Sequence, residues 1–189
     1  MKEKSNIALV GFRASGKSLI GRLLARQCDL SFVDMDERLV ASFGQDIDQW
    51  VRVEGWESFR QAESELLEEL AHGQALVVAT GGGVILSARN RHLLKTHFHV
   101  IWLKASLETT WLRLQNDPNT DKNRPALTTL PLREEIEQTL VARSALYEET
   151  ADIILETDAT PAAELVSQLQ SRLWADRKAG GGACAFPRT

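Results

Sequence analysis

The 189-residue chain has few cysteines, no long apolar run and no excess of positive charge. Its two cysteines, Cys28 and Cys184, lie far apart without the spacing of a metal site, so we expect free thiols in a reducing cytosol. No stretch approaches the roughly 18 apolar residues that a membrane span requires. The net charge of −4 excludes a general electrostatic attraction to nucleic acid or to anionic membranes. Any anionic ligand must therefore be bound by a local group of Lys, Arg and backbone N–H groups.

Short apolar segments alternate with amphipathic helical segments along the chain. The predicted strands cover residues 7–10, 32–33, 75–80, 99–103 and 153–155. The predicted helices begin near residues 17, 37, 87, 106, 132 and 161, and the second is broken near Gly44 and Gly55. This alternation predicts an α/β sandwich around a mostly parallel sheet. The sequence contains no internal repeat and no linker, which indicates one domain.

Residues 11–18, GFRASGKS, match the pattern G-x-x-x-x-G-K-[ST] at every required position. An apolar strand precedes them and a helix follows, which is the context that this motif needs. The glycines let backbone N–H groups turn toward phosphate oxygens, and the helix N-terminus adds partial positive charge. Lys17 can reach the β- and γ-phosphates, and the Ser18 hydroxyl can ligate Mg²⁺. The loop predicts a nucleoside triphosphate site, but it does not separate a kinase from a GTPase, an ATPase motor or a nucleotide-sensing switch.

Further candidate residues follow the predicted strands. Asp34 and Asp36 end a strand at the edge where open α/β sheets bind ligands, although a helix cap explains an aspartate there equally well. Residues 81–83, three glycines after a buried strand, permit close approach of backbone to a ligand. Arg60 and Arg143 could each hold a carboxylate with two hydrogen bonds, but taken singly each fits a solvated helix residue better.

The segment 116–131 is polar, rich in turn formers and without periodicity. Such a segment inside a compact domain is a candidate lid. Arg124 lies within it and could reach the transferring phosphoryl group.

Six segments carry a resemblance to one family: residues 11–18 (GFRASGKS), 32–36 (FVDMD), 54–60 (EGWESFR), 79–84 (ATGGGV), 123–128 (NRPALT) and 142–152 (ARSALYEETAD). In this order and spacing the chain resembles the shikimate kinases over residues 5–173. The resemblance implies a P-loop NTPase fold of the nucleoside-monophosphate-kinase type, a three-layer α/β/α sandwich with a five-stranded parallel sheet. One domain at 1–174 would then contain a substrate-binding region at about 34–62 and the lid at about 116–131, and we expect a disordered tail at 175–189.

The resemblance also implies ATP-dependent phosphorylation of the 3-hydroxyl of shikimate, a step toward chorismate and the aromatic amino acids. It makes Lys17, Asp36 and Arg124 the catalytic residues, with Asp36 as the candidate base. The substrate-binding residues would be Asp36, Arg60, Gly81, Gly82, Gly83 and Arg143, the two arginines holding the carboxylate. Ser18 would bind Mg²⁺ directly and Asp34 through water. The ATP-binding residues would be Gly11, Ala14, Ser15, Gly16, Lys17, Ser18, Leu19, Arg113, Arg124 and Pro161, with Arg113 and Pro161 near adenine.

The departures from the family pattern are few. Leu19 stands where many members have Thr, and the charged Arg13 inside the loop is expected to face solvent. Trp50 and Trp56 are expected in the core. Two alternatives stay open, a small-molecule kinase of the gluconate kinase kind and a nucleotide-binding regulator without turnover. We expect a cytoplasmic monomer that binds shikimate and ATP, and neither nucleic acid nor membrane.

Overall fold

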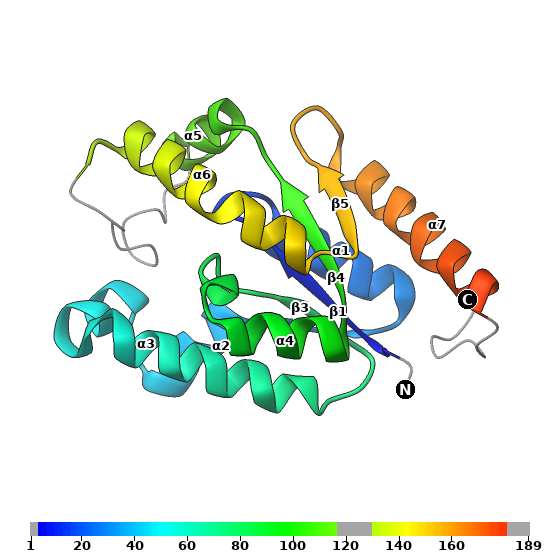
Figure 1. Cartoon of the computed structure of the whole chain (residues 1–189), viewed down its shortest axis with the longest axis horizontal. Coiled ribbons are helices and arrows are strands. Elements are labelled where there is room, and N and C mark those ends of the chain that lie inside the picture. Colours follow the sequence, from blue (N-terminus) through cyan, green and yellow to red (C-terminus); the bar gives the residue numbers. More distant parts are fainter. Residues whose placement is uncertain (1–3, 117–129, 181–189) are drawn as a thin grey trace.

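The computed structural model describes residues 4–116 and 130–180, with side chains described up to residue 173. Within these ranges five strands form one parallel sheet in the order β2-β3-β1-β4-β5 (Figure 1). The strands are β1 (Asn6–Val10), β2 (Ser31–Asp34), β3 (Leu76–Ala79), β4 (Phe98–Lys104) and β5 (Ile153–Glu156). The α/β fold with a five-stranded parallel sheet is therefore confirmed.

Helices cover both faces of the sheet. They are α1 (Lys17–Cys28), α2 (Met35–Phe43), α3 (Ile47–Ala71), α4 (Ala88–His97), α5 (Leu107–Gln115), α6 (Leu132–Thr150) and α7 (Ala162–Gly180), with a short 3₁₀ turn η1 (Val84–Leu86). In Figure 1, α1 and α7 lie on one side of the strands, and α3, α4 and α6 lie on the other. This is the three-layer arrangement that the sequence predicted.

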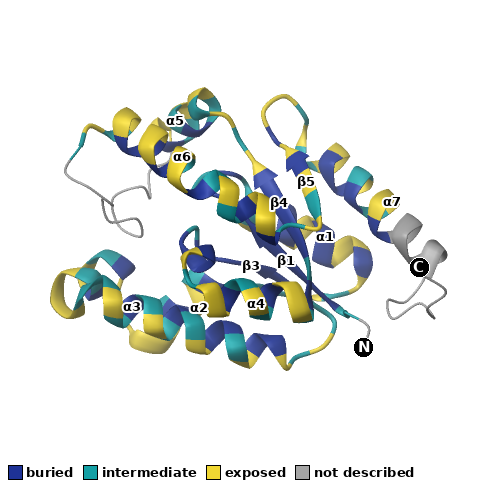
Figure 2. Ribbon diagram, in the orientation of Figure 1, coloured by how far each residue is buried: buried dark blue, intermediate teal, exposed yellow. Residues whose placement is uncertain are grey.

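The central strand β1 is buried along its whole length because both of its faces pack against helices. Ile7 and Leu9 join the cluster formed with α1 and α7, whereas Ala8 and Val10 join the cluster formed with α3, α4 and Tyr147 of α6. Figure 2 shows this buried sheet between helices whose outer faces are exposed. The alternation places successive side chains of one strand in two separate cores.

Several helix ends have a local sequence signal. Ser87 and Ser106 cap α4 and α5 by accepting hydrogen bonds from backbone N–H groups. Gly44 ends α2 in the left-handed region at φ +68°, and Gly55 at φ +82° interrupts α3. The predicted end of the last helix at residue 174 is wrong, since α7 continues to Gly180. The sequence of residues 175–180, ADRKAG, adds no apolar periodicity, so the hydrophobic pattern ended the prediction too early.

The other general expectations concern single residues. Trp50 is buried and Trp56 packs against the same core, as predicted. Cys28 is a buried thiol outside any disulfide among the described residues and accepts a hydrogen bond from Gln170 Nε2 at 3.7 Å, whereas Cys184 lies outside the described residues. None of the helices in the described ranges combines the length and the apolar character that a bilayer span requires.

A third, smaller cluster joins the loop after β1 to the helices on either side of residues 117–129. Its buried members are Phe12, Leu114 and Ile136, and partly buried side chains of α5 and α6 pack against them. The predicted lid at 116–131 lies almost entirely outside the described residues. The helices that flank it, however, are packed directly against the phosphate loop.

Candidate active site

The loop between β1 and α1 has the backbone shape of an anion cradle. Gly11 adopts φ +147°, and a Cβ added there would lie 2.5 Å from the Leu103 carbonyl oxygen. Gly16 adopts φ +95° and is the N-cap of α1, so no N-cap side chain covers the first N–H groups of that helix. Lys17 Nζ donates to the carbonyl oxygens of Gly11 and Phe12, each at 2.9 Å. The loop therefore presents backbone N–H groups and one ammonium at the same place.

Ser18 and Asp34 form the pair of oxygen donors expected for a magnesium site. Ser18 Oγ donates to Asp34 Oδ2 at 2.5 Å. The other carboxylate oxygen of Asp34 accepts from the N–H groups of Asp36 and Glu37, which caps α2. Both interpretations of Asp34, helix cap and metal-site residue, thus fit one conformation. Hydroxyl and carboxylate oxygens are ligands that Mg²⁺ prefers, and phosphates and waters usually complete its coordination.

Two adjoining cavities open beside the loop. One, of about 340 Å³, is lined by Arg13, Ala14, Gly16, Lys17, Ser18, Leu19, Asp34, Asp36, Thr80, Gly82 and Arg113. The other, of about 260 Å³, is lined by Ala14, Ser15, Gly16, Leu19, Ile20, Arg113, Thr157, Thr160, Ala162 and Leu165. Because both include Arg113 and the loop, together they offer room for the phosphates and the base of one nucleotide.

Arg113 is held at the junction of the two cavities. Its guanidinium donates to the carbonyl oxygens of Ala14 at 3.2 Å and of Thr157 at 2.6 Å. Pro161 does not line either cavity, although its neighbours Thr160 and Ala162 do. Arg124, the remaining residue predicted for ATP, lies outside the described residues.

Strand order explains why the acceptor residues meet the loop. The strands β2, β3 and β1 are consecutive in the sheet. β2 ends at Asp34, β3 is followed after Thr80 by the triple glycine, and β1 is followed directly by the phosphate loop. Asp36 lies in the first turn of α2 and lines the phosphate cavity together with Gly82. Arg143 comes from α6 on the same face, is only 9% exposed, and donates to the Gly82 carbonyl at 3.0 Å. The prediction that Arg143 taken singly is solvated is therefore wrong.

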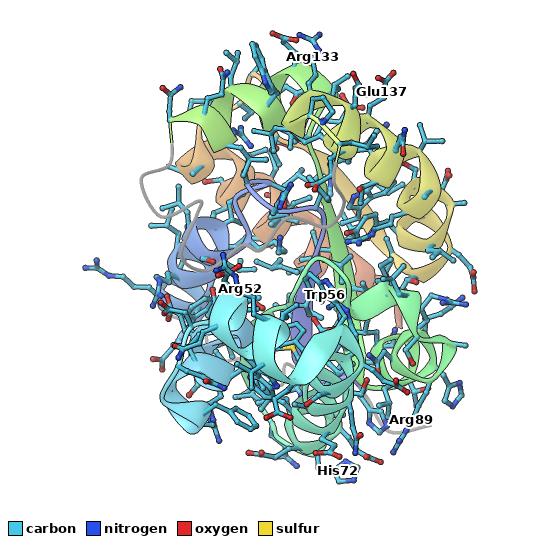
Figure 3. The ribbon with its side chains drawn as sticks, turned by 90° about the vertical axis from the view of Figure 1, so that its left-hand side faces the viewer. Arg52, Trp56, His72, Arg89, Arg133 and Glu137 are labelled. Carbon is cyan, nitrogen blue, oxygen red and sulfur yellow. The ribbon has the colours of Figure 1, made fainter. Side chains whose placement is uncertain are left out.

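Arg60 is held in place by groups of its own helix. It donates to Glu63 Oε2 at 2.7 Å, and its guanidinium lies over the rings of Trp56 and Phe59. Figure 3 shows Trp56 near the centre of the view, beside Arg52 of the same helix and below Arg133 and Glu137 of α6. An ion pair, two aromatic faces and partial burial leave this arginine little freedom.

Glu63 was not found by sequence reasoning. It is fully buried, and its Oε1 has no hydrogen-bond partner within the described residues. Burial raises the pKa of Glu63 from 4.5 to about 6, although the neighbouring Arg60 opposes this shift. The i,i+3 spacing from Arg60 was a signal for the ion pair, but nothing local indicated burial.

Tyr147, the single tyrosine of the chain, is the second residue that sequence reasoning missed. Its hydroxyl donates to the Gly82 carbonyl at 2.5 Å, and its ring stacks on Trp102 at a centroid distance of 5.5 Å. Burial raises its pKa to about 12, so it stays a neutral donor. Two side chains of α6, Arg143 and Tyr147, thus donate to one carbonyl of the triple glycine.

The triple glycine makes room for side chains. A Cβ at Gly81 would lie 2.1 Å from Glu63 Oε1, and one at Gly83 would lie 2.3 Å from Arg60 Nη2. A Cβ at Gly82 would meet nothing closer than 3.4 Å, the carbonyl oxygen of Gly11. We expected a ligand to approach this backbone closely. At Gly81 and Gly83 the groups that lie close to the backbone are instead the side chains of Glu63 and Arg60.

The expectation that Arg13 faces solvent is wrong. Its guanidinium forms an ion pair with Glu135 in the first turn of α6, and the two side chains are 13% and 3% exposed. The reason lies in the tertiary packing, because the first turn of α6 lies against the phosphate loop and places the Glu135 carboxylate beside Arg13. No local pattern around Arg13 could have indicated a partner so far along the chain.

A parallel sheet with this phosphate loop, a Ser–Asp oxygen pair and an adjoining arginine-lined region defines the class as a P-loop phosphotransferase. The family follows from comparison with known proteins, because a model described as shikimate kinase matches residues 13–174. The chain therefore belongs to the shikimate kinase family.

Relatives and solved structures agree with this assignment. The shikimate kinase of Vibrio parahaemolyticus is 42% identical over 173 residues, which cover 92% of this chain and 98% of the relative. That of Actinobacillus pleuropneumoniae serotype 5b is 40% identical over 177 residues, which cover 90% of this chain and 100% of the relative. The structure of the Acinetobacter baumannii shikimate kinase in complex with shikimate is 33% identical, with a TM-score of 0.86, and covers 92% of this chain and 95% of that one.

A gluconokinase from Sinorhizobium meliloti shares the fold at 17% identity and a TM-score of 0.50, covering 93% of this chain and 99% of that one. At this distance the likeness concerns the fold alone.

Proposed function

We propose that the protein transfers the γ-phosphoryl group of ATP to the 3-hydroxyl of shikimate, giving shikimate 3-phosphate and ADP. One observation carries this proposal. A single cavity is lined both by the phosphate-loop residues Lys17 and Ser18 and by Asp36 and Gly82 of the acceptor side. A donor phosphate and an acceptor hydroxyl can therefore share one space, which is the main requirement for phosphoryl transfer.

The acceptor side fits a small carboxylic acid that also has hydroxyl groups. Arg60 and Arg143 supply two guanidinium groups that can bind a carboxylate. Asp36 accepts the hydroxyl proton as the hydroxyl oxygen bonds to the γ-phosphorus and the bond to the ADP oxygen breaks. An aspartate suffices as base because, in a reaction with a loose transition state, the hydroxyl loses its proton only late.

The nucleotide side supplies charge and alignment. Backbone N–H groups of the loop and of the α1 N-terminus bind phosphate oxygens, and Lys17 balances the charge that develops between donor and acceptor. Ser18 and Asp34 would hold Mg²⁺, which neutralises phosphate charge when bound. Arg113 and the residues around Thr160 line the space for adenine. The monomeric state, the cytoplasmic location and the single domain at 1–174 stay predictions.

The test is release of ADP from Mg·ATP by the purified protein with shikimate, with gluconate and with no acceptor. We expect a rate that depends on shikimate and is unaffected by gluconate. A rate that depends on gluconate would favour the other small-molecule kinase, since its fold is shared. Nucleotide binding without ADP release for any acceptor would favour a regulator.

A further inference from the structure

Helix α6 is attached to the phosphate loop by its first turn. Ile136 packs with Phe12 in the third cluster, and the neighbouring residue Glu135 forms the ion pair with Arg13. Both charged side chains are largely removed from water, in contrast to an ordinary surface pair. The loop that would bind phosphate therefore holds the start of α6 through both apolar and charged contacts.

The same helix reaches the acceptor side about 12 Å further on, at 1.5 Å per residue over the eight residues from Glu135 to Arg143. There, Arg143 and Tyr147 donate to the Gly82 carbonyl at 3.0 and 2.5 Å. Gly82 in turn lies against the loop, because a Cβ added to it would be 3.5 Å from the Arg13 backbone nitrogen. Helix α6 thus contacts the loop directly at one end and through Gly82 near its middle.

We propose that Arg13 and Glu135 are a positioning pair, which fixes α6 against the phosphate loop and so makes nucleotide binding and shikimate binding strengthen each other. This inference rests on the proposed function. Phosphates that order the loop also fix the place of Arg13, and through Glu135 they fix the helix that carries Arg143. By linkage, a shikimate carboxylate that orders Arg143 favours the same arrangement of the loop.

Burial explains why the pair has this effect. A largely buried carboxylate such as that of Glu135 is destabilised when an ion-pair partner is removed, so losing Arg13 favours a movement of the first turn of α6 toward water. A helix moves largely as one body, so the displacement reaches Arg143. When both charges are removed together, neither is left buried without its partner, so the protein should lose little stability. A change in binding in that variant then reports the positioning role and not a loss of stability.

The experiment measures the shikimate dissociation constant by calorimetry, with and without Mg·ADP, so that no turnover occurs. The ratio of the two constants reports the coupling. The variants are Arg13→Met, Glu135→Gln and the double variant Arg13→Met/Glu135→Leu. The matched control is Arg133→Met, which breaks an exposed 3.0 Å ion pair between Arg133 and Glu108 at the start of the same helix. Figure 3 shows Arg133 at the outer edge of the molecule.

We expect a ratio of about 5 or more in the wild-type protein and in the control, within the usual range of allosteric coupling. In all three pair variants the ratio should fall toward 1, including the double variant, whose melting temperature should lie closest to that of the wild type. A wild-type ratio of 1, or a wild-type ratio retained in Glu135→Gln and in the double variant, would overturn the proposal. The double variant removes both buried charges, so the test does not depend on the folding of the two single variants.

Failure of the proposed function looks different. A wild-type protein that neither binds shikimate nor releases ADP in its presence would overturn the function, and the inference with it. A wild-type protein that turns over, together with variants that keep its ratio, would overturn the positioning pair alone.

Discussion

The nucleotide side and the acceptor side of the active site are built from different kinds of chemical group. On the nucleotide side, eight consecutive residues form the phosphate loop, and the directions of its backbone N–H groups follow from glycine conformations. On the acceptor side, the groups are side chains from α2, α3 and α6, and the two arginines are held by another side chain or by one carbonyl. The first half depends on local backbone geometry and the second on packing between distant elements.

This difference has consequences for how each half fails. The cradle is built from backbone, so losing Lys17 should remove charge and two hydrogen bonds to loop carbonyls and leave the rest of the fold intact. A group of mutually supported side chains loses its geometry when one neighbour is displaced. Substitutions on the nucleotide side should therefore act on kcat, and those on the acceptor side should act first on the shikimate KM.

Lys17→Met should have the largest effect. Its ammonium is the charged donor in the loop, and removal of one such donor at a developing charge costs roughly 10²–10³ in kcat. Steady-state kinetics should show this loss, while the melting temperature stays close to that of the wild type. Lys95→Met, which removes an exposed lysine of α4 that donates to the Glu149 carbonyl, is the control. Near-normal turnover in Lys17→Met would remove this lysine from the transition state.

Gly83→Ala should raise the shikimate KM by roughly 10-fold, because 1 to 2 kcal/mol of lost binding corresponds to about that factor. The new methyl group would overlap Arg60 Nη2, which a Cβ would approach to 2.3 Å, and the guanidinium would have to move. Gly82→Ala is the informative comparison in the same kinetic assay, since its Cβ would meet nothing nearer than 3.4 Å. A larger increase in the shikimate KM for Gly82→Ala would mean that the main role of the triple glycine is to let a ligand approach the backbone, and not to make room for Arg60.

The contrast between the two halves also separates what the sequence could predict from what it could not. The phosphate loop was predictable because its chemistry lies in eight adjacent residues, and the sheet because each strand is a short apolar run. Asp34 stayed ambiguous for a physical reason, since capping α2 and facing Ser18 use its two oxygens at once.

The acceptor side was reached mainly through resemblance to a family, because its residues meet only in the folded chain. Arg13 and Glu135 are 122 positions apart, and Tyr147 donates to a carbonyl 65 positions away. Glu63 is a charged residue at a fully buried position, and helical periodicity predicts buried positions only from apolar residues. Pairings at such distances are decided by how α3 and α6 pack, and local pattern carries no signal of them.

Glu63 should produce the smallest of these effects, visible in the pH dependence of stability. Because the pKa of Glu63 is raised from 4.5 to about 6, the folded protein binds more protons than the unfolded chain between these pH values. The contribution of this carboxyl to the free energy of unfolding therefore falls as pH rises from 4.5 to 6, by about 2 kcal/mol in all.

Glu63→Gln removes this titration, so its melting temperature relative to the wild type should increase by a few degrees across the same range. Glu65→Gln, an exposed position on the same helix, should instead give a curve parallel to that of the wild type. Parallel curves for Glu63→Gln and the wild type would show that Arg60 offsets the burial of this carboxylate completely. The charge of Glu63 would then cost the folded protein nothing. The acceptor side would differ from the nucleotide side only in being built from side chains that pack together and not from backbone.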